Sequence, residues 1–449
     1  MNRRQFMQAA GAVALGAANA RAAQPSTPRN VVFYITDDQG MGDAGCYGNP
    51  HVRTPGLDEL AREGVRFTNA FCTTPSCSPS RSVLLTGTHN HTNGQYGLAH
   101  AAHHFSSYDD VKSLPVTLGK AGYRTLGAGK FHTLPQSAYV FQNYIQRADP
   151  EEMAEQCRPF LEAKDERPFF LCFCPVEPHR PFHRKGAAPV DPTAIDVHPH
   201  LPDIPECRQE LAEYYGSIER ADIGLKKLIE MLKKNGHWEN TLIVYLTDNG
   251  MPWPGAKTTL YEPGVNLPCV VRDPRNPRKG YTCNAMVSWL DIMPTILEFC
   301  DLNEPACTGR SFLNAMREDD PQGWDEVYFS HSFHEVTMYY PMRGVRTRTH
   351  KLIFNIAHAL PFPFASDLWK SKTWQAVLER NLTQYGKRSV DAYINRSRFE
   401  LYDLVNDPHE IKNLAEDPEH QQLLADLKQR IRTMQEKTKD PWLLKWDRE

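Results

Sequence analysis

The sequence lacks the charge bias and the repeats that would indicate nucleic-acid binding or a repeat architecture. No block of like charges occurs, and 51 Lys and Arg stand against 54 Asp and Glu, for a formal net charge of -3. A chain with this balance has no broad basic surface for nucleic acid. No long repeat or low-complexity tract is present. Any ability to bind anions must therefore be local.

Paired Cys-x-x-Cys motifs at zinc spacing are also missing, so a zinc site is not expected. The eleven cysteines would suit disulfides outside the cytoplasm, but a chain of 449 residues can bury a core without them. Because the count is odd, at least one thiol stays unpaired or has another use.

An apolar run long enough to span a membrane, about 20 residues, is missing even at the N-terminus. There Arg3, Arg4 and Phe6 precede the shorter apolar run 9–20, and Ala20-Arg21-Ala22 offers a small-x-small cleavage site. This pattern predicts a signal peptide of the twin-arginine type over residues 1–22. We therefore expect export to the periplasm or beyond, without stable insertion into the membrane.

Two apolar, β-branched runs end in acids. Residues 31–36 lead into Asp37 and Asp38, and residues 241–247 lead into Asp248 and Asn249. Such continuous apolar runs are typical of strands buried in a parallel sheet. Ligands of open α/β sheets bind beyond the carboxyl ends of the strands. Both acidic ends are therefore expected at one site.

Further segments alternate between helix and strand. Helices are predicted at 116–121, 223–232 and 290–300, and strands at 123–128 and 168–175. This alternation predicts an α/β domain with a large, mainly parallel sheet flanked by helices, over 28–320. Beyond a polar stretch at 319–326 the pattern changes to short mixed strands, such as 345–353, and a closing amphipathic helix at 421–437. Residues 321–449 are expected to form a smaller α+β domain.

Carboxylate and amide oxygens are the ligands that hard cations prefer, which indicates Ca²⁺, with Mg²⁺ as the second choice. Any one of these acids taken alone fits a helix cap or a solvated turn equally well. Their convergence on one sheet edge favours a metal site. The expected ligands are Asp37, Asp38, Asp248 and Asn249.

The segment Cys77-Ser78-Pro79-Ser80-Arg81, continued by Leu85-Thr86-Gly87, carries the most specific chemical signal. Its cysteine could act as a nucleophile beside the guanidinium of Arg81. A plain turn before a helix, with Pro79 near its start, explains the same residues.

This segment resembles the signature of sulfatases, in which the cysteine is oxidised to formylglycine by a maturation enzyme. Other motifs follow in the sulfatase order: the two acidic strand ends, residues 129–132, 178–181 and 257–264, and 400–408 near the C-terminus. The resemblance covers nearly the whole mature chain. It implies an alkaline-phosphatase-like sandwich and places Cys77, as formylglycine, in the metal shell.

Three loop stretches resemble the heparan N-sulfatase branch (sulfamidases, N-sulfoglucosamine sulfohydrolases) more than sulfatases at large. They are residues 93–98 with 103–105, residues 334–343, and Asp440-Pro441-Trp442. Substrate contacts usually lie in loops. His104, His334, Glu335 and Arg343 are therefore candidate substrate contacts, with Arg343 opposite a uronic acid or second sulfate.

The resemblance assigns roles to five further side chains. Lys130 and Lys257 are expected to neutralise the sulfate oxygens, and Arg81 to hold the aldehyde hydrate. One hydroxyl of the hydrate attacks sulfur, the sugar amine leaves, and deprotonation of the second hydroxyl expels sulfate. His132 is expected as the base of that last step and His179 as the donor to the leaving nitrogen, although these two roles are interchangeable on sequence grounds.

The sequence therefore predicts hydrolysis of the N-sulfate of glucosamine in heparan-type glycans. Three alternatives remain: an O-sulfatase for another sulfated sugar, a phosphomonoesterase or phosphonate esterase with the same architecture, and a sugar-binding protein with an unmodified Cys77. The expected partners are a sulfated saccharide, the maturation enzyme and the twin-arginine machinery, and a homodimer is left open. Because that machinery carries folded protein, the modification would have to finish in the cytoplasm.

Overall fold

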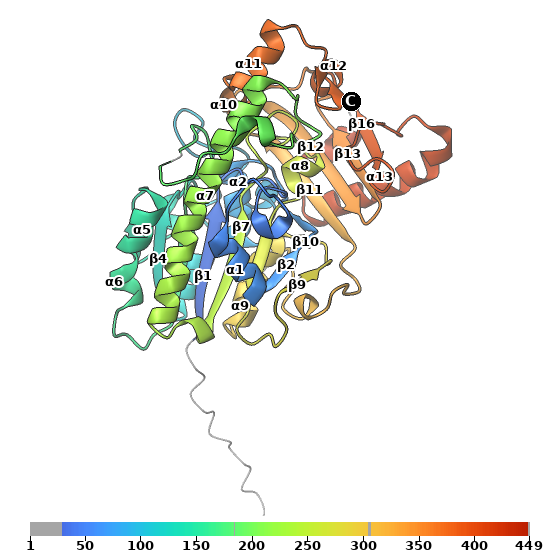
Figure 1. The fold of residues 1–449 in the computed structure, drawn as a ribbon. Coiled ribbons are helices and arrows are strands. Elements are labelled where there is room, and N and C mark those ends of the chain that lie inside the picture. Colours follow the sequence, from blue (N-terminus) through green and yellow to red (C-terminus); the bar gives the residue numbers. More distant parts are fainter. Residues whose placement is uncertain (1–28, 184, 304–306, 448–449) are drawn as a thin grey trace, which may run out of the picture.

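The computed structural model describes residues 29–183, 185–303 and 307–447, and the predicted signal peptide lies outside them. An eight-stranded sheet forms the centre of the larger part (Figure 1). Its first five strands are parallel, whereas β8 runs antiparallel to both of its neighbours. In spatial order they are β5 (Asn143–Ile145), β4 (Arg124–Gly129), β6 (Phe169–Cys174), β1 (Asn30–Thr36), β7 (Thr241–Thr247), β8 (Cys269–Arg272), β2 (Val65–Phe67) and β9 (Tyr281–Cys283).

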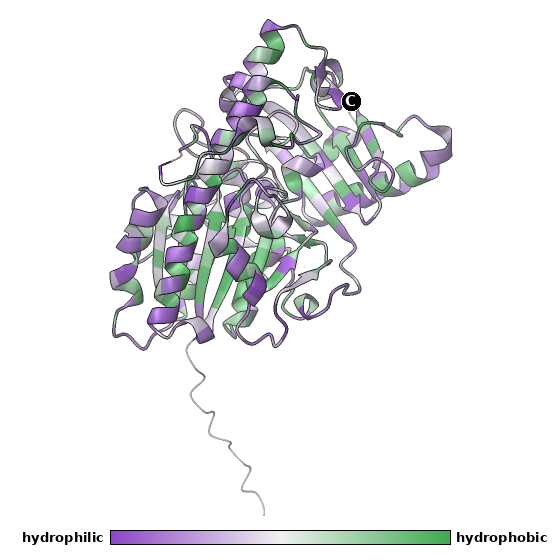
Figure 2. Cartoon of the chain, viewed as in Figure 1, coloured by the Kyte–Doolittle hydropathy of each residue, from purple (hydrophilic) through white to green (hydrophobic). Residues whose placement is uncertain are grey.

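Helices cover both faces of this sheet, because its strands are apolar on both sides. Figure 2 shows the strands in green and the helices with purple outer faces. One apolar core contains side chains of β1, β6 and β7 together with α1 (Pro55–Glu63), α5 (Pro150–Gln156), α6 (Arg158–Leu161) and α7 (Pro205–Lys234). The core on the opposite face contains α2 (Cys77–Thr86), α4 (Leu114–Lys120) and α9 (Ile292–Phe299).

A second, antiparallel sheet follows in the C-terminal part. Its order is β11 (Glu326–Phe333), β12 (Tyr339–Thr347), β13 (His350–Asn355) and β16 (Phe399–Asp403). The amphipathic α13 (Gln421–Lys437) packs its apolar face on this sheet. The remaining short elements are α3 (Asn90–Asn93), α8 (Glu262–Val265), α10 (Ser366–Trp369), α11 (Lys372–Glu379), α12 (Val390–Ile394) and the strand pairs β3–β10 (Ala70–Phe71, Val287–Ser288) and β14–β15 (Gln384–Tyr385, Arg388–Ser389).

Buried polar contacts join the two sheets. The ammonium of Lys351 on β13 contacts Glu262 of α8 at 2.7 Å and Glu410 at 2.8 Å. Tyr261 donates a hydrogen bond of 2.8 Å to Glu400 on β16. An unpaired charge in so buried a place would be costly, so these pairs specify one arrangement of the two parts.

The predicted fold class is confirmed, with two differences in detail. The helix expected at 223–232 is the end of the much longer α7. The single strand expected at 345–353 is a hairpin, because β12 ends at Thr347 and β13 begins at His350. Among the described residues, no helix is long and apolar enough to cross a membrane.

Candidate active site

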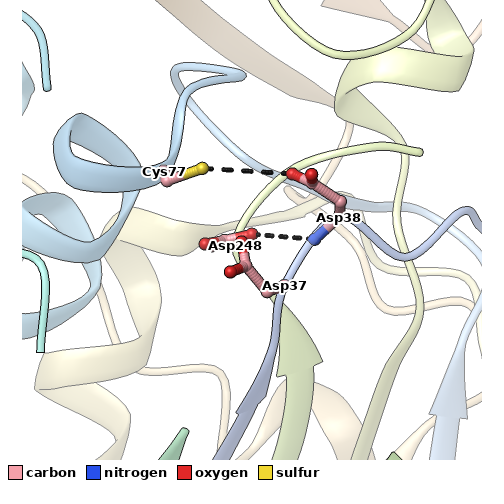
Figure 3. Close-up of side chains that lie close together, drawn as sticks. All are labelled: Asp37, Asp38, Cys77 and Asp248. Atoms are coloured by element: carbon pink, nitrogen blue, oxygen red, sulfur yellow. Dashed lines mark hydrogen bonds between the residues drawn. The ribbon is translucent and has the colours of Figure 1, made fainter. Parts of the chain in front are cut away.

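The acidic ends of β1 and β7 meet, as parallel register requires. Thr36 pairs with Thr247, so Asp37 and Asp248 follow at the same edge. Asp38 has the left-handed φ of 69° and donates its backbone N–H to Asp248 Oδ1 at 3.2 Å. Figure 3 shows the carboxylate of Asp38 directed toward the sulfur of Cys77 and its backbone nitrogen directed toward Asp248.

Cys77 completes this group from the opposite side. It is the first residue of α2, and its sulfur lies 3.9 Å from Asp38 Oδ1. The four residues of the group each offer one ligand atom, and these atoms lie within 4.8 Å of one another. The positive end of the α2 dipole faces the same point, which favours an anion there. The four are Asp37, Asp38, Cys77 and Asp248.

Two buried oxygens at this point have no hydrogen-bond partner among the residues that the structure describes. They are Oδ1 of Asp37 and Oδ1 of Asn249, and both residues are fully buried. Buried acceptors without partners are costly, and a hard cation between oxygens removes that cost. The donor set therefore fits a calcium or magnesium ion.

Three cations surround the acids. Arg81 donates from Nε to Asp248 at 2.8 Å, Lys130 contacts Asp37, and Lys257 donates to Asp38 at 2.8 Å. Although burial opposes it, neighbouring carboxylates raise the pKa of the Lys257 ammonium well above its usual range, and the pKa of Lys130 is raised in the same way. All three cations are at least nine-tenths buried and remain charged.

The three cations nevertheless do not balance the negative charge of the carboxylates in this cluster. Lys257 also pairs with a fourth carboxylate, Asp367, at 2.9 Å, so four carboxylates face three cations. Burial and nearby carboxylates raise the pKa of Asp248 to about 7 and that of Asp38 to about 6. A divalent ion would change the net charge of the cluster from one negative to one positive unit.

Two histidines face the cluster from the ends of β4 and β6. His179 Nε2 lies 3.8 Å from Asp38 and 3.9 Å from Asp367, while its Nδ1 bonds to the backbone carbonyl of Arg180. Because a carbonyl only accepts, Nδ1 carries the hydrogen and Nε2 presents its lone pair to the site. His132, with a positive φ of 56°, bonds to His100.

A cavity of about 520 Å³ opens beside these side chains and is lined by Lys130, His132 and His179. A larger cavity, of about 720 Å³, lies between residues 195–208 and 382–386 and contains none of the expected catalytic residues. We take the smaller cavity as the substrate site, because it reaches the reactive cluster.

Comparison with known proteins agrees with this geometry. Residues 29–302 match the sulfatase family, and residues 255–361 and 383–437 match the C-terminal domain of N-sulphoglucosamine sulphohydrolases. The chain belongs to the sulfatase family. The sulfatase is 37% identical to human N-sulphoglucosamine sulphohydrolase, over 93% of this chain and 91% of the relative. It is 29% identical to an ulvan-active sulfatase of Formosa agariphila, over 89% and 78% of the two chains.

Solved structures show the same fold. BT4656 in complex with its substrate D-glucosamine-2-N,6-O-disulfate superimposes with a TM-score of 0.71 at 19% identity, over 92% of this chain and 99% of that one. The phosphonate monoester hydrolase of Agrobacterium radiobacter gives a TM-score of 0.69 at 17% identity, over 91% and 96%. At such low identity these similarities establish the architecture and leave the substrate open.

The C-terminal part of the sulfatase reaches into the site. Asp367, on α10, contacts Lys257 and faces His179. Glu335 accepts the backbone N–H of Ser366 at 2.8 Å and so fixes the start of α10. His334 bonds through Nδ1 to Ser76, the residue before Cys77, at 2.8 Å. Both predicted residues therefore support reactive groups.

Asp367 and His100 were not among the predicted site residues. Asp367 is a single acid in an aromatic stretch with no recognisable spacing, and only the fold brings it near Lys257. His100 belongs to a histidine-rich loop, and nothing in the sequence pairs it with His132.

Two predicted substrate contacts are placed elsewhere. His104 is exposed and does not line the substrate cavity. Arg343 is fully buried: its guanidinium pairs with both oxygens of Asp440 and donates to the carbonyls of His331 and Met342. These bonds use four of the five N–H groups of Arg343, and its side chain is fully buried, so the structure gives Arg343 an internal ion pair in place of the predicted contact with a uronic acid or second sulfate.

Proposed function

We propose that this sulfatase hydrolyses the N-sulfate of glucosamine residues in heparan-type glycans, with Cys77 converted to formylglycine and a bound calcium ion. One observation carries the proposal: a residue that the family oxidises lies among three carboxylates and three cations, one of which, Lys130, lines a cavity. The similarity over nearly the whole length to an N-sulphoglucosamine sulphohydrolase supports the choice of the N-sulfate.

When bound, the cation would be held by Asp37, Asp38, Asp248 and Asn249 and would supply Lewis-acid charge opposite the sulfate oxygens. The sulfur of Cys77 stands where the hydrated aldehyde would present its oxygens. Arg81 is pinned by Asp248 and by the carbonyl of Lys130, at 3.1 Å, and so lies in a fixed position beside that hydrate.

Lys130 and Lys257 act as fixed positive charges for the tetrahedral anion. Both are buried, so their charge is poorly screened and acts strongly on a bound sulfate. Each is held by a carboxylate behind it, which fixes the ammonium before the substrate arrives. Such preorganisation avoids reorganisation cost during the reaction.

The two histidines are assigned to the proton-transfer steps. His179 presents Nε2 beside Asp38 and Asp367, but burial and the nearby Lys257 lower the pKa of His179 to about 4, so its imidazole is neutral before the substrate binds. Once His179 has taken up a proton, it donates that proton to the leaving nitrogen. Burial and the adjacent Lys130 keep the pKa of His132 well below its usual range, so His132 is neutral and suited to act as the base that triggers sulfate release.

The N-terminal pattern supports export by the twin-arginine route to the periplasm or beyond, after modification by a formylglycine-generating enzyme in the cytoplasm. Residues 28–320 would form the catalytic domain, and residues 321–449 a smaller domain that supplies substrate-side loops. Asp367 and Glu335 support this division, because both come from the second segment.

The test compares four substrates with the enzyme purified from its native host: N-sulfoglucosamine, glucosamine 6-O-sulfate, an aryl sulfate and an aryl phosphate. We expect the highest kcat/KM for N-sulfoglucosamine. A preference for the 6-O-sulfate would replace the proposal with an O-sulfatase, and a preference for the phosphate with a phosphoesterase. Binding without turnover of any of the four would indicate a sugar-binding protein.

A further inference from the structure

Besides Lys130, His132 and His179, the substrate cavity has a region lined by Gln136, Tyr144, Gln146 and Arg147. None of the twelve residues that line the cavity is an aspartate or a glutamate. An anion that enters this region therefore meets no carboxylate in the wall. This region of the cavity is thus suited to a second negative group of the substrate.

Arg147 provides the free positive charge in this region. The two full cations in the lining are Lys130 and Arg147, and Lys130 is already paired with Asp37. Arg147 is exposed and has no ion pair or side-chain hydrogen bond with any residue that the structure describes. The acid nearest to it in sequence, Asp149, is engaged by Arg220.

The position of Arg147 is set by the sheet. β5 lies parallel to β4, with Ala128 opposite Ile145, so the residues that follow the two strands leave the same edge side by side. Tyr144 donates to the carbonyl of Gly129 at 2.6 Å and fastens β5 at this point. Neighbouring strands lie about 4.8 Å apart. Lys130 directly follows β4 and Arg147 follows β5 by two residues, so the two cations leave neighbouring strands at one edge of the sheet, and both line the cavity.

We propose that Arg147, with the amide of Gln146, binds a second anionic group of the saccharide whose N-sulfate is removed. The group is either another sulfate on the glucosamine or the carboxylate of an adjoining uronic acid, since a guanidinium binds both through paired hydrogen bonds. The inference rests on the proposed function and adds that the enzyme prefers doubly charged substrates. It also explains an unpaired arginine at the rim of an acid-free cavity.

The test measures affinity without turnover, by calorimetry on protein that carries Cys77→Ala. Three ligands are compared: N-sulfoglucosamine, its 6-O-sulfated form, and a disaccharide of N-sulfoglucosamine and a uronic acid. For each protein variant, the affinity for a doubly charged ligand is divided by the affinity for N-sulfoglucosamine to give a ratio. Arg147→Ala should lower this ratio about tenfold for at least one doubly charged ligand, the loss typical of a charged hydrogen-bonded contact.

Two variants serve as controls. Arg147→Lys keeps the charge but loses the planar fork, and should retain part of the preference. Arg317→Ala removes an exposed arginine with no described side-chain partner, beside β9 at the opposite edge of the sheet. It should leave the ratio unchanged. The ligand that loses affinity identifies the group: the 6-O-sulfated form indicates a sulfate and the disaccharide a carboxylate.

The inference would be overturned if Arg147→Ala and its parent gave equal affinity ratios for both doubly charged ligands. Turnover of N-sulfoglucosamine by the enzyme with Cys77 intact is measured separately. A turnover-competent enzyme with unchanged ratios would reject the Arg147 subsite alone. An Arg147-dependent ratio in a protein that does not cleave N-sulfoglucosamine would reject the proposed reaction and keep the anion subsite.

Discussion

Removal of the divalent ion should weaken the binding of sulfated ligands, and the charge count of the site gives the reason. Four carboxylates face three cations within one buried cluster. Above a pH of about 7, where Asp248 is also ionised, the cluster without a divalent ion carries one excess negative charge and repels an anion. With the ion it carries one excess positive charge and attracts the same anion.

The size of the effect follows from Coulomb's law. At an effective dielectric constant of about 20, a unit charge about 5 Å from the sulfate contributes about 3 kcal/mol. The change from one negative to one positive unit therefore sets an upper limit of about 6 kcal/mol. Coupling between two bound ligands is usually about 1–3 kcal/mol, so we expect a loss of affinity of about 5- to 150-fold.

The assay is a calorimetric titration of N-sulfoglucosamine into protein that carries Cys77→Ala, either loaded with calcium or treated with a chelator. A neutral ligand, glucosamine with its amine acetylated, serves as the control and should bind with similar affinity in both states. The reasoning would be refuted by N-sulfoglucosamine binding equally well with and without the divalent ion.

Three further predictions concern single side chains. Asp440→Asn should lower the free energy of unfolding by about 3–5 kcal/mol in urea denaturation, because it leaves the buried charge of Arg343 unpaired. Burial opposes ionisation of Asp440, but Arg343 holds the pKa of Asp440 well below its usual range. The loss in free energy of unfolding should therefore be complete above a pH of about 4 and become smaller below it. A loss that stays constant at all pH values would refute this. Asp367→Asn should lower kcat/KM by about tenfold, because Lys257 loses one of its two carboxylate partners. Asp367→Glu keeps the carboxylate and should recover part of the loss. An unchanged kcat/KM in Asp367→Asn would contradict this role. Cys77→Ala should abolish hydrolysis while its urea midpoint stays near that of the parent, and measurable residual turnover would reject Cys77 as the nucleophile position.

The sequence was sufficient to predict the acidic sheet edge because short-range rules apply there. Residues 31–36 and 241–247 are continuous apolar runs, and parallel strands bring their ends together. The hairpin at 347–350 was missed because its turn, Arg348-Thr349, contains no Gly, Pro, Asn or Asp, so no turn signal separates the two strands.

Residues beyond the motifs were harder to place. Arg343 lies in a loop-like motif and resembled a substrate contact, but its partner Asp440 is 97 residues away and no local pattern joins them. Asp367 reaches Lys257 only because the second sheet packs beside the first. Contacts of this kind depend on tertiary packing and need the fold before they can be assigned.

The most direct test of the central claim is mass spectrometry of the peptide that contains residue 77, from protein made in its native host. The account predicts an aldehyde at this position, which hydroxylamine captures as an oxime, in the same preparation that releases sulfate from N-sulfoglucosamine. An intact thiol in a preparation that still cleaves the substrate would contradict it.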